Sequence, residues 1–175
     1  TVGGGIRNLN DIQTALNSGA DKVSINTQAV ENPNFIYEAA HRFGSQCIIG
    51  SIEAKINDKN KWLVYYDNGR EQTEIDVVEW AQQLEKLGAG ELLITSVDME
   101  GTKKGFDIEL NKTISQKLTI PVISSGGAGH SDHIINLFKD TEVEGVALAS
   151  ILHYDISEIL SIKNNLIDNK IQVRV

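Results

Sequence analysis

The sequence has a single cysteine, Cys47, so its 175 residues cannot form an intramolecular disulfide. Two isoleucines follow it directly, and this apolar context predicts a buried thiol within a strand. No apolar stretch approaches the roughly 20 residues that a membrane-spanning helix needs, and no signal peptide is recognisable. We therefore expect a cytoplasmic protein with no membrane partner.

Basic charge is also scarce. The chain has 16 Lys and Arg against 24 Asp and Glu, a formal net charge of −8, and no run of basic residues stands out. On electrostatic grounds we therefore expect no nucleic-acid partner. A small anion can still bind, because backbone N–H groups can hold it against the overall charge.

The sequence lacks the common metal and cofactor motifs. Its four histidines are scattered, and although His130 and His133 are three residues apart at a predicted helix start, no third ligand accompanies them. There is no nucleophile elbow, no P-loop and no pair of C-x-x-C motifs. We expect neither a bound metal nor a cofactor.

Short apolar runs alternate with amphipathic helical patterns along the whole chain. The runs predict strands that end near Val2, Ile25, Ile52, Ile94, Ser124 and Leu148. Helices are predicted from Asn8 or Asn10 to 18, and over 33–43, 76–87, 108–118, 131–139 and 156–168, with Ser131 as the cap of the fifth. Residues 57–73 predict a β-hairpin inserted after a strand, because an Asp-Asn-Gly turn follows the apolar run at 62–66.

Repeated βα units of this kind predict parallel strands in one α/β domain over residues 1–175. Six such strands fit a doubly wound sheet, or the last six strands of an eight-stranded barrel. The chain begins with Thr1-Val2 and not with Met, which we interpret as the tail of a strand in a truncated sequence. Two further units would bring the length to about 250 residues, so we predict a (β/α)8 barrel lacking roughly its first two units.

Two glycine-rich turns stand in matching places. Residues 3–5 (GGG) precede a helix and a strand that ends in SINT at 24–27, and residues 125–129 (SGGAG) precede a helix and a strand that ends in ALAS at 147–150. Free backbone N–H groups at such turns hold anions, and glycine lets a phosphate approach closely. The matched pair predicts a ligand with a phosphate at each end. The alternative is that the glycines only form tight turns.

Carboxylates follow two of the predicted strands at the end where barrels carry their active sites. Glu53 comes directly after a strand and is a candidate general acid or base, although an ion pair with Lys55 would also explain it. Asp98 and Glu100 lie in the loop after the next strand, where they either contact a substrate or order the loop.

Two charged residues, Lys22 and Glu91, stand at strand beginnings, at the opposite end of the predicted barrel. They are expected to form a stabilising ion pair or to frame a pore.

Five segments together carry a family resemblance: TVGGGIR at 1–7, GADKVSINT at 19–27, FGSQC at 43–47, GAGELLITS at 88–96 and SSGGAG at 124–129. With them the chain closely resembles the cyclase subunit of imidazole glycerol phosphate synthase over essentially its whole length. The sister isomerase of histidine biosynthesis shares the glycine turns but lacks the VSIN and FGSQ stretches.

The resemblance implies a ribulose-phosphate-binding (β/α)8 barrel with lyase activity. Such a subunit receives ammonia through the barrel from a glutamine amidotransferase partner. It joins the ammonia to a bis-phosphorylated aminoimidazole carboxamide ribulotide, which yields imidazole glycerol phosphate and an aminoimidazole carboxamide ribotide.

The resemblance also assigns roles to individual residues. Matching positions imply one phosphate site at Gly4, Gly5, Asn26 and Thr27, a second at Ser125, Gly126, Gly127, Ala149 and Ser150, and an ammonia entrance with Lys22 and Glu91. The candidate substrate loop, with Thr95, Ser96, Asp98 and Glu100, rests on its place after a strand.

Departures from the family pattern leave alternatives open. The family's catalytic aspartate on the first strand is not in this chain, so we expect the chain alone to be inactive, and the second aspartate is replaced by Glu53. Glu100 also stands where the cyclase usually has aspartate. The segments at 51–55, 65–71 and 100–102 look more like paralogues that serve sugar amidation in surface polysaccharide synthesis. A non-catalytic phosphate-binding module is a further alternative.

Overall fold

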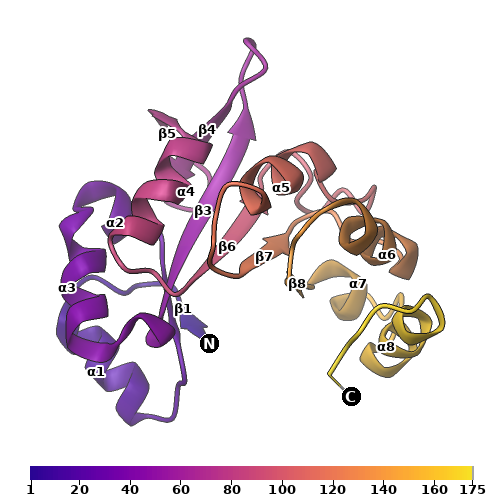
Figure 1. Cartoon of the computed structure of the whole chain (residues 1–175), viewed down its shortest axis with the longest axis horizontal. Coiled ribbons are helices and arrows are strands. Elements are labelled where there is room, and N and C mark those ends of the chain that lie inside the picture. The colour runs from indigo at the N-terminus through magenta and orange to yellow at the C-terminus, as the bar shows by residue number, and fades with distance from the viewer. Residues whose placement is uncertain (175) are drawn as a thin grey trace.

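A curved parallel sheet forms the centre of the computed structural model, which describes residues 1–174 (Figure 1). Its strands lie in the order β1 (Val2–Gly3), β2 (Val23–Ile25), β3 (Ile48–Ile56), β6 (Glu91–Ser96), β7 (Val122–Ser125) and β8 (Gly145–Ala147). A doubly wound sheet would reverse its strand order at a switch point. Here the order in space follows the order in the chain, as in a barrel, so the predicted partial (β/α)8 barrel is confirmed.

Helices follow the strands in the expected alternation. They are α1 (Leu9–Asn17), α2 (Thr27–Glu31), α3 (Asn34–Phe43), α4 (Val77–Lys86), α5 (Ile108–Ser115), α6 (Ser131–Asp140), α7 (Ser150–His153) and α8 (Ile159–Asp168). Side chains that accept hydrogen bonds from free N–H groups begin four of them, α1, α4, α5 and α6. Asn8 forms a capping box with Asp11 on α1, and Asp76 and Asp107 cap α4 and α5.

Several local predictions are wrong. Cys47 lies in a 3₁₀ turn, Ser45–Cys47, and is partly exposed, because pairing between β2 and β3 begins only at Ile48. Ser131 is the first residue of α6 and not its cap: the extended backbone of His130 brings its Nδ1 within 3.3 Å of the Asp132 amide. The sequence pattern also missed α2 and α7, which are too short to show a helical period, and α8 begins later than predicted, at Ile159.

The predicted hairpin is confirmed, and it is joined to a barrel strand. β4 (Trp62–Tyr66) pairs antiparallel with β5 (Glu71–Asp76) and also with the extended end of β3, where Glu53 lies opposite Tyr65. Strand β3 therefore runs to Ile56, beyond the predicted end at Ile52. The resulting antiparallel ribbon projects from the end of the sheet at which the parallel strands finish (Figure 1).

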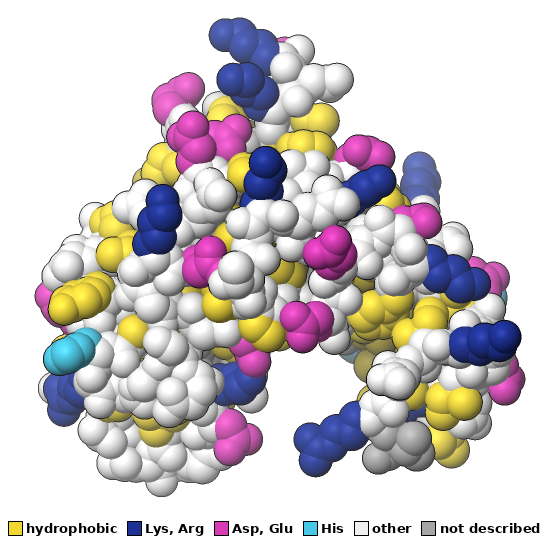
Figure 2. Space-filling model, viewed as in Figure 1, with side chains coloured by type: hydrophobic (Ala, Val, Ile, Leu, Met, Phe, Trp, Pro, Cys, Tyr) yellow, Lys and Arg dark blue, Asp and Glu magenta, His cyan; other side chains and the backbone are white. Residues whose placement is uncertain are grey.

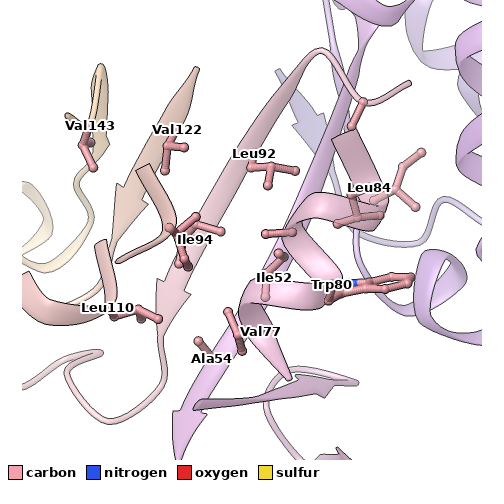
Figure 3. Close-up of a cluster of buried hydrophobic side chains, with 14 of the residues drawn as sticks. Ile52, Ala54, Val77, Trp80, Leu84, Leu92, Ile94, Leu110, Val122 and Val143 are labelled. Carbon is pink, nitrogen blue, oxygen red and sulfur yellow. The ribbon is translucent and has the colours of Figure 1, made fainter. Parts of the chain in front are cut away.

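The hydrophobic core lies between the sheet and its helices. Figure 3 shows Trp80 and Leu84 of α4 beside Ile52 of β3 and Leu92 and Ile94 of β6, all almost fully buried. Because side chains alternate along a strand, residues next to these buried positions point to the other face of the sheet, the interior of the barrel. This alternation directs the side chains of the site inward.

Candidate functional site

The first predicted phosphate turn opens onto a pocket of about 580 Å³ at the ends of β1 and β2. Gly4, Gly5, Asn26 and Thr27 line it together with Glu53. Both glycines have left-handed backbones, with φ of 89° and 74°, and a Cβ at either would meet no atom within 4 Å. Glycine is therefore required here by backbone conformation, and the open space beside it suits the approach of an anion.

The second phosphate turn lines a smaller pocket, of about 90 Å³, at the ends of β7 and β8. The structure brings together all five predicted residues there, Ser125, Gly126, Gly127, Ala149 and Ser150. Glu100 lines the same pocket and places a carboxylate at its wall. Phosphate binding in these two pockets stays a prediction.

The glycines of the second turn have a structural reason that the sequence did not reveal. A Cβ at Gly127 would overlap the carbonyl of Gly105, and a Cβ at Gly129 would overlap the carbonyl of Lys103. A Cβ at Gly126 would lie 2.8 Å from the Ser96 carbonyl oxygen. The loop after β6 therefore packs directly on this turn, so these glycines are needed with or without a ligand.

Glu53 lies on β3, paired with Tyr65 of β4 on one side and with Thr95 of β6 on the other. Its Oε2 accepts a hydrogen bond from Asn26 Nδ2 at 3.0 Å and another from the Gly69 amide at 2.8 Å. The ion pair considered for Lys55 is not formed, since the Lys55 ammonium lies over the Tyr65 ring, 5.6 Å from its centroid.

Burial raises the pKa of the Glu53 carboxyl above its ordinary value. The hydrogen bonds from Gly69 and Asn26 lower this pKa, while the nearby negative charge of Asp67 raises it further. A carboxyl group with a raised pKa, at the wall of a pocket, is a candidate general acid or base.

The four residues of the predicted substrate loop do not act as one group. Thr95 lies in the sheet between Glu53 and Ser125, and the buried Ser96 is on the opposite face. Asp98 Oδ2 accepts a hydrogen bond from the Ile56 amide at 2.8 Å, which ties the loop to the end of β3. Of the four, only Glu100 lines one of the two pockets.

Lys22 and Glu91 form an ion pair at the other end of the sheet, where strands begin. Glu91 is the first residue of β6, and Lys22 directly precedes β2. The expected ion pair is therefore confirmed, and its role at an ammonia entrance stays a prediction.

Residues 1–174 contain no group of three or more His, Cys, Asp or Glu side chains placed to hold a metal ion. The two neighbouring histidines have local roles: His130 caps α6, and His133 Nδ1 accepts a hydrogen bond from the Gly129 amide. None of the helices in the same residues is long and apolar enough to cross a membrane.

Comparison with known proteins decides the family. Residues 1–158 match the family described as "Histidine biosynthesis protein". Over all 175 residues the chain is 51% identical to "Imidazole glycerol phosphate synthase subunit HisF" of Hydrogenobaculum sp. (strain Y04AAS1). It is 50% and 48% identical to the subunits of the same name from Bacillus cereus strains G9842 and ATCC 10987 / NRS 248.

The chain belongs to the HisF family of imidazole glycerol phosphate synthase subunits. It spans 69% of the length of these relatives. It is thus a cyclase subunit of a histidine-biosynthesis enzyme of the lyase class, and the name of its relatives indicates a synthase of more than one subunit.

Sequence reasoning missed several residues that line the first pocket of this HisF-family chain, among them Arg7 and two residues of the hairpin turn. Arg7 lines the pocket two residues after the last glycine, and the hairpin turn brings in Asp67 and Asn68. The position of Arg7 beside a glycine turn was a usable signal. The turn could be predicted as a turn, but nothing in the sequence showed which pocket it meets.

Proposed function

We propose that the full-length protein is the cyclase subunit that uses ammonia from a glutamine amidotransferase to convert a bis-phosphorylated aminoimidazole carboxamide ribulotide. The products are imidazole glycerol phosphate and an aminoimidazole carboxamide ribotide. The proposal includes a cytoplasmic location, no cofactor, and a single domain over residues 1–175.

The observation that carries this proposal is the pair of glycine-lined pockets at the same end of the sheet. One lies at the ends of β1 and β2 and the other at the ends of β7 and β8, with β3 and β6 between them. A ligand with a phosphate at each end can occupy both pockets and lay its reacting centre across β3 and β6. Glu53 and Thr95 stand on those two strands, side by side in the register of the sheet.

In this reading Glu53 is the general acid or base, for which its raised pKa is suited. Ammonia enters beside Lys22 and Glu91 and travels through the barrel to the reacting centre. The aspartate that the family carries on its first strand is not among these 175 residues, so activity is to be measured on the full-length protein.

The test is turnover of the ribulotide with ammonium salts by the full-length protein and by Glu53→Gln. We expect the substitution to lower kcat by about 10²-fold to 10⁴-fold, the contribution typical of an acid–base group. Glu74→Gln is the matched control, because Glu74 is an exposed glutamate on β5 of the hairpin. Normal turnover by Glu53→Gln would remove Glu53 from the mechanism.

A second candidate is supported by the glutamates at positions 53 and 100, where the cyclase usually has aspartates. It is a paralogue that serves ammonia-dependent sugar amidation in surface polysaccharide synthesis. No turnover of the ribulotide by the wild type, with polysaccharide genes and not histidine genes as neighbours, would favour it. Calorimetric binding of the ribulotide without turnover would instead support a non-catalytic phosphate-binding module.

Binding to a glutamine amidotransferase subunit is the remaining part of the proposal. Co-purification of the two full-length proteins, with glutamine replacing ammonium as nitrogen source, is the expected result. Turnover that still requires free ammonium in the presence of the partner would contradict it.

A further inference from the structure

The turn between β4 and β5, at residues 67–69, closes onto the first pocket. Asp67, Asn68 and Gly69 all have left-handed backbones, with φ of 51°, 58° and 73°. This run of conformations is uncommon outside glycine, asparagine and aspartate, and the chain has those residue types here. The Asp67 amide donates to Thr27 Oγ1 at 3.3 Å, and the Gly69 amide donates to Glu53 Oε2.

The two oxygens of the Glu53 carboxyl group are held differently. Oε2 accepts both hydrogen bonds, one from Gly69 in the turn and one from Asn26 at the end of β2. Within the described residues Oε1 has no hydrogen-bond partner, and Glu53 lines the pocket. An oxygen that already accepts two N–H groups is a poor site for a proton, so the proton of the neutral acid belongs on Oε1.

We propose that the turn at 67–69 is a positioning element for Glu53: the Gly69 amide, together with Asn26, holds Oε2 and leaves Oε1 to exchange the proton with substrate. The inference rests on the proposed acid–base role of Glu53. When Glu53 acts as a base, an O–H bond forms at Oε1 while the electron pair of the broken bond stays with the substrate. When it acts as an acid, the same O–H bond breaks and the proton moves to the substrate.

Few charged groups surround this carboxyl. Arg7, Glu31 and Asp67 line the same pocket, Lys55 follows on the same strand, and the phenol of Tyr65 lies on β4 opposite. Of these, Asp67 is the one whose charge raises the pKa of Glu53. The turn therefore contributes a hydrogen bond and a charge to the same residue, with opposite effects on its pKa.

The first experiment needs no substrate. In ¹H–¹⁵N spectra of the full-length protein, the Gly69 amide proton should titrate with the same midpoint as the Glu53 side-chain carboxyl carbon. In Glu53→Gln this titration should disappear. The Gly101 amide is the matched control, because its φ of 72° is similar and no neighbouring atom lies within 4 Å of its would-be Cβ. A Gly69 amide that does not follow Glu53 would overturn the proposal.

The second experiment follows activity. Asp67→Asn should move the limb of the pH–rate profile that reports Glu53 to lower pH, while Asp58→Asn, at the far end of the hairpin, should leave it in place. Equal profiles in both variants would contradict a role for the turn. If Gly69 follows Glu53 but the ribulotide is not turned over, the positioning role stands and the proposed substrate fails. If the ribulotide is turned over but the Gly69 amide does not follow Glu53, the proposed substrate stands and the positioning role of the turn fails.

Discussion

Glu53 combines opposing influences in one side chain. Burial and the charge of Asp67 raise the pKa of its carboxyl group, while two N–H donors lower it, and the balance lies above the ordinary value. A residue in this position destabilises the folded protein when it ionises, which is a recurrent cost of functional sites. The contribution of Glu53 to stability therefore depends on pH, and the direction of its pKa shift gives the direction of that dependence.

We expect the unfolding free energy of Glu53→Gln, measured relative to that of the wild type, to be higher at pH 8 than at pH 4. Between the pKa of the unfolded chain, about 4.3, and the higher pKa of the folded protein, the folded state of the wild type binds more protons. Wild-type stability falls as pH rises through that window, and glutamine removes this loss. Because Glu53 is only partly buried, we expect a difference below about 1 kcal/mol by urea unfolding. An identical effect of the substitution at both pH values would contradict the raised pKa.

The glycines of the two turns should respond differently to alanine. Gly5→Ala should cost roughly 1–2 kcal/mol, from the left-handed backbone alone, because its Cβ enters open space. Gly127→Ala should cost about 1–3 kcal/mol more, because its Cβ overlaps the Gly105 carbonyl.

Urea unfolding measures the unfolding free energy of the Gly5→Ala and Gly127→Ala variants. Calorimetry with inorganic phosphate measures their phosphate affinity separately. Equal losses of stability at the two positions would show that the loop after β6 yields without cost.

At the scale of elements, the hairpin and the loop after β6 form one connected structure. The Val97 amide donates to the Ala54 carbonyl at 2.8 Å, and Trp62 Nε1 donates to Asp107 Oδ2 at 3.2 Å. Farther along the loop, the Gly105 amide donates to the Gly127 carbonyl at 2.8 Å. A continuous set of contacts thus runs from the hairpin, whose turn borders the first pocket, to the turn that lines the second.

Asp98→Ala should weaken this connection. It removes the acceptor of the Ile56 amide, for which a loss of about 0.5–1.5 kcal/mol in unfolding free energy is expected. Asp98→Asn keeps an oxygen in reach and should cost less. Hydrogen exchange at the Ile56 amide is the direct measurement, and unchanged protection in Asp98→Ala would contradict the assignment.

At the scale of the whole molecule, the sheet is an open barrel. β1 and β8 each pair with one neighbour in the described residues, so each leaves an unpaired edge. Helix α8 also exposes large apolar side chains, of which Leu160 at 61% and Ile159 at 57% are the most exposed. Figure 2 shows the molecule hollowed between the part that carries α1–α3 and the part that carries α7 and α8.

A polypeptide of these 175 residues alone should therefore self-associate, because open edges and exposed apolar side chains favour pairing between copies. Light scattering after gel filtration should show species larger than the 19.2 kDa chain. Replacing both Ile159 and Leu160 with lysine should reduce association if α8 mediates it, and leave it unchanged if the sheet edges do. A cooperative melt from a monomer would contradict the prediction.

The sequence by itself determined the parts of this protein that depend on neighbours in the chain. The order of strands and helices, helix starts near Asn8 and Asp76, the hairpin and the two glycine turns could be predicted, because hydrophobic period and capping chemistry act over a few residues. With the strand ends known, parallel pairing placed both turns and Glu53 at one end of the sheet.

Only the tertiary structure decided contacts between distant segments. That Gly69 holds Glu53, that Asp98 holds the Ile56 amide and that Gly127 packs on Gly105 follow from how the loops fold over the end of the sheet. Such contacts join residues 16 to 42 positions apart, and no local periodicity encodes which loop meets which. The residue types of the site could therefore be identified from the sequence, while the contacts that position them depend on how the loops fold.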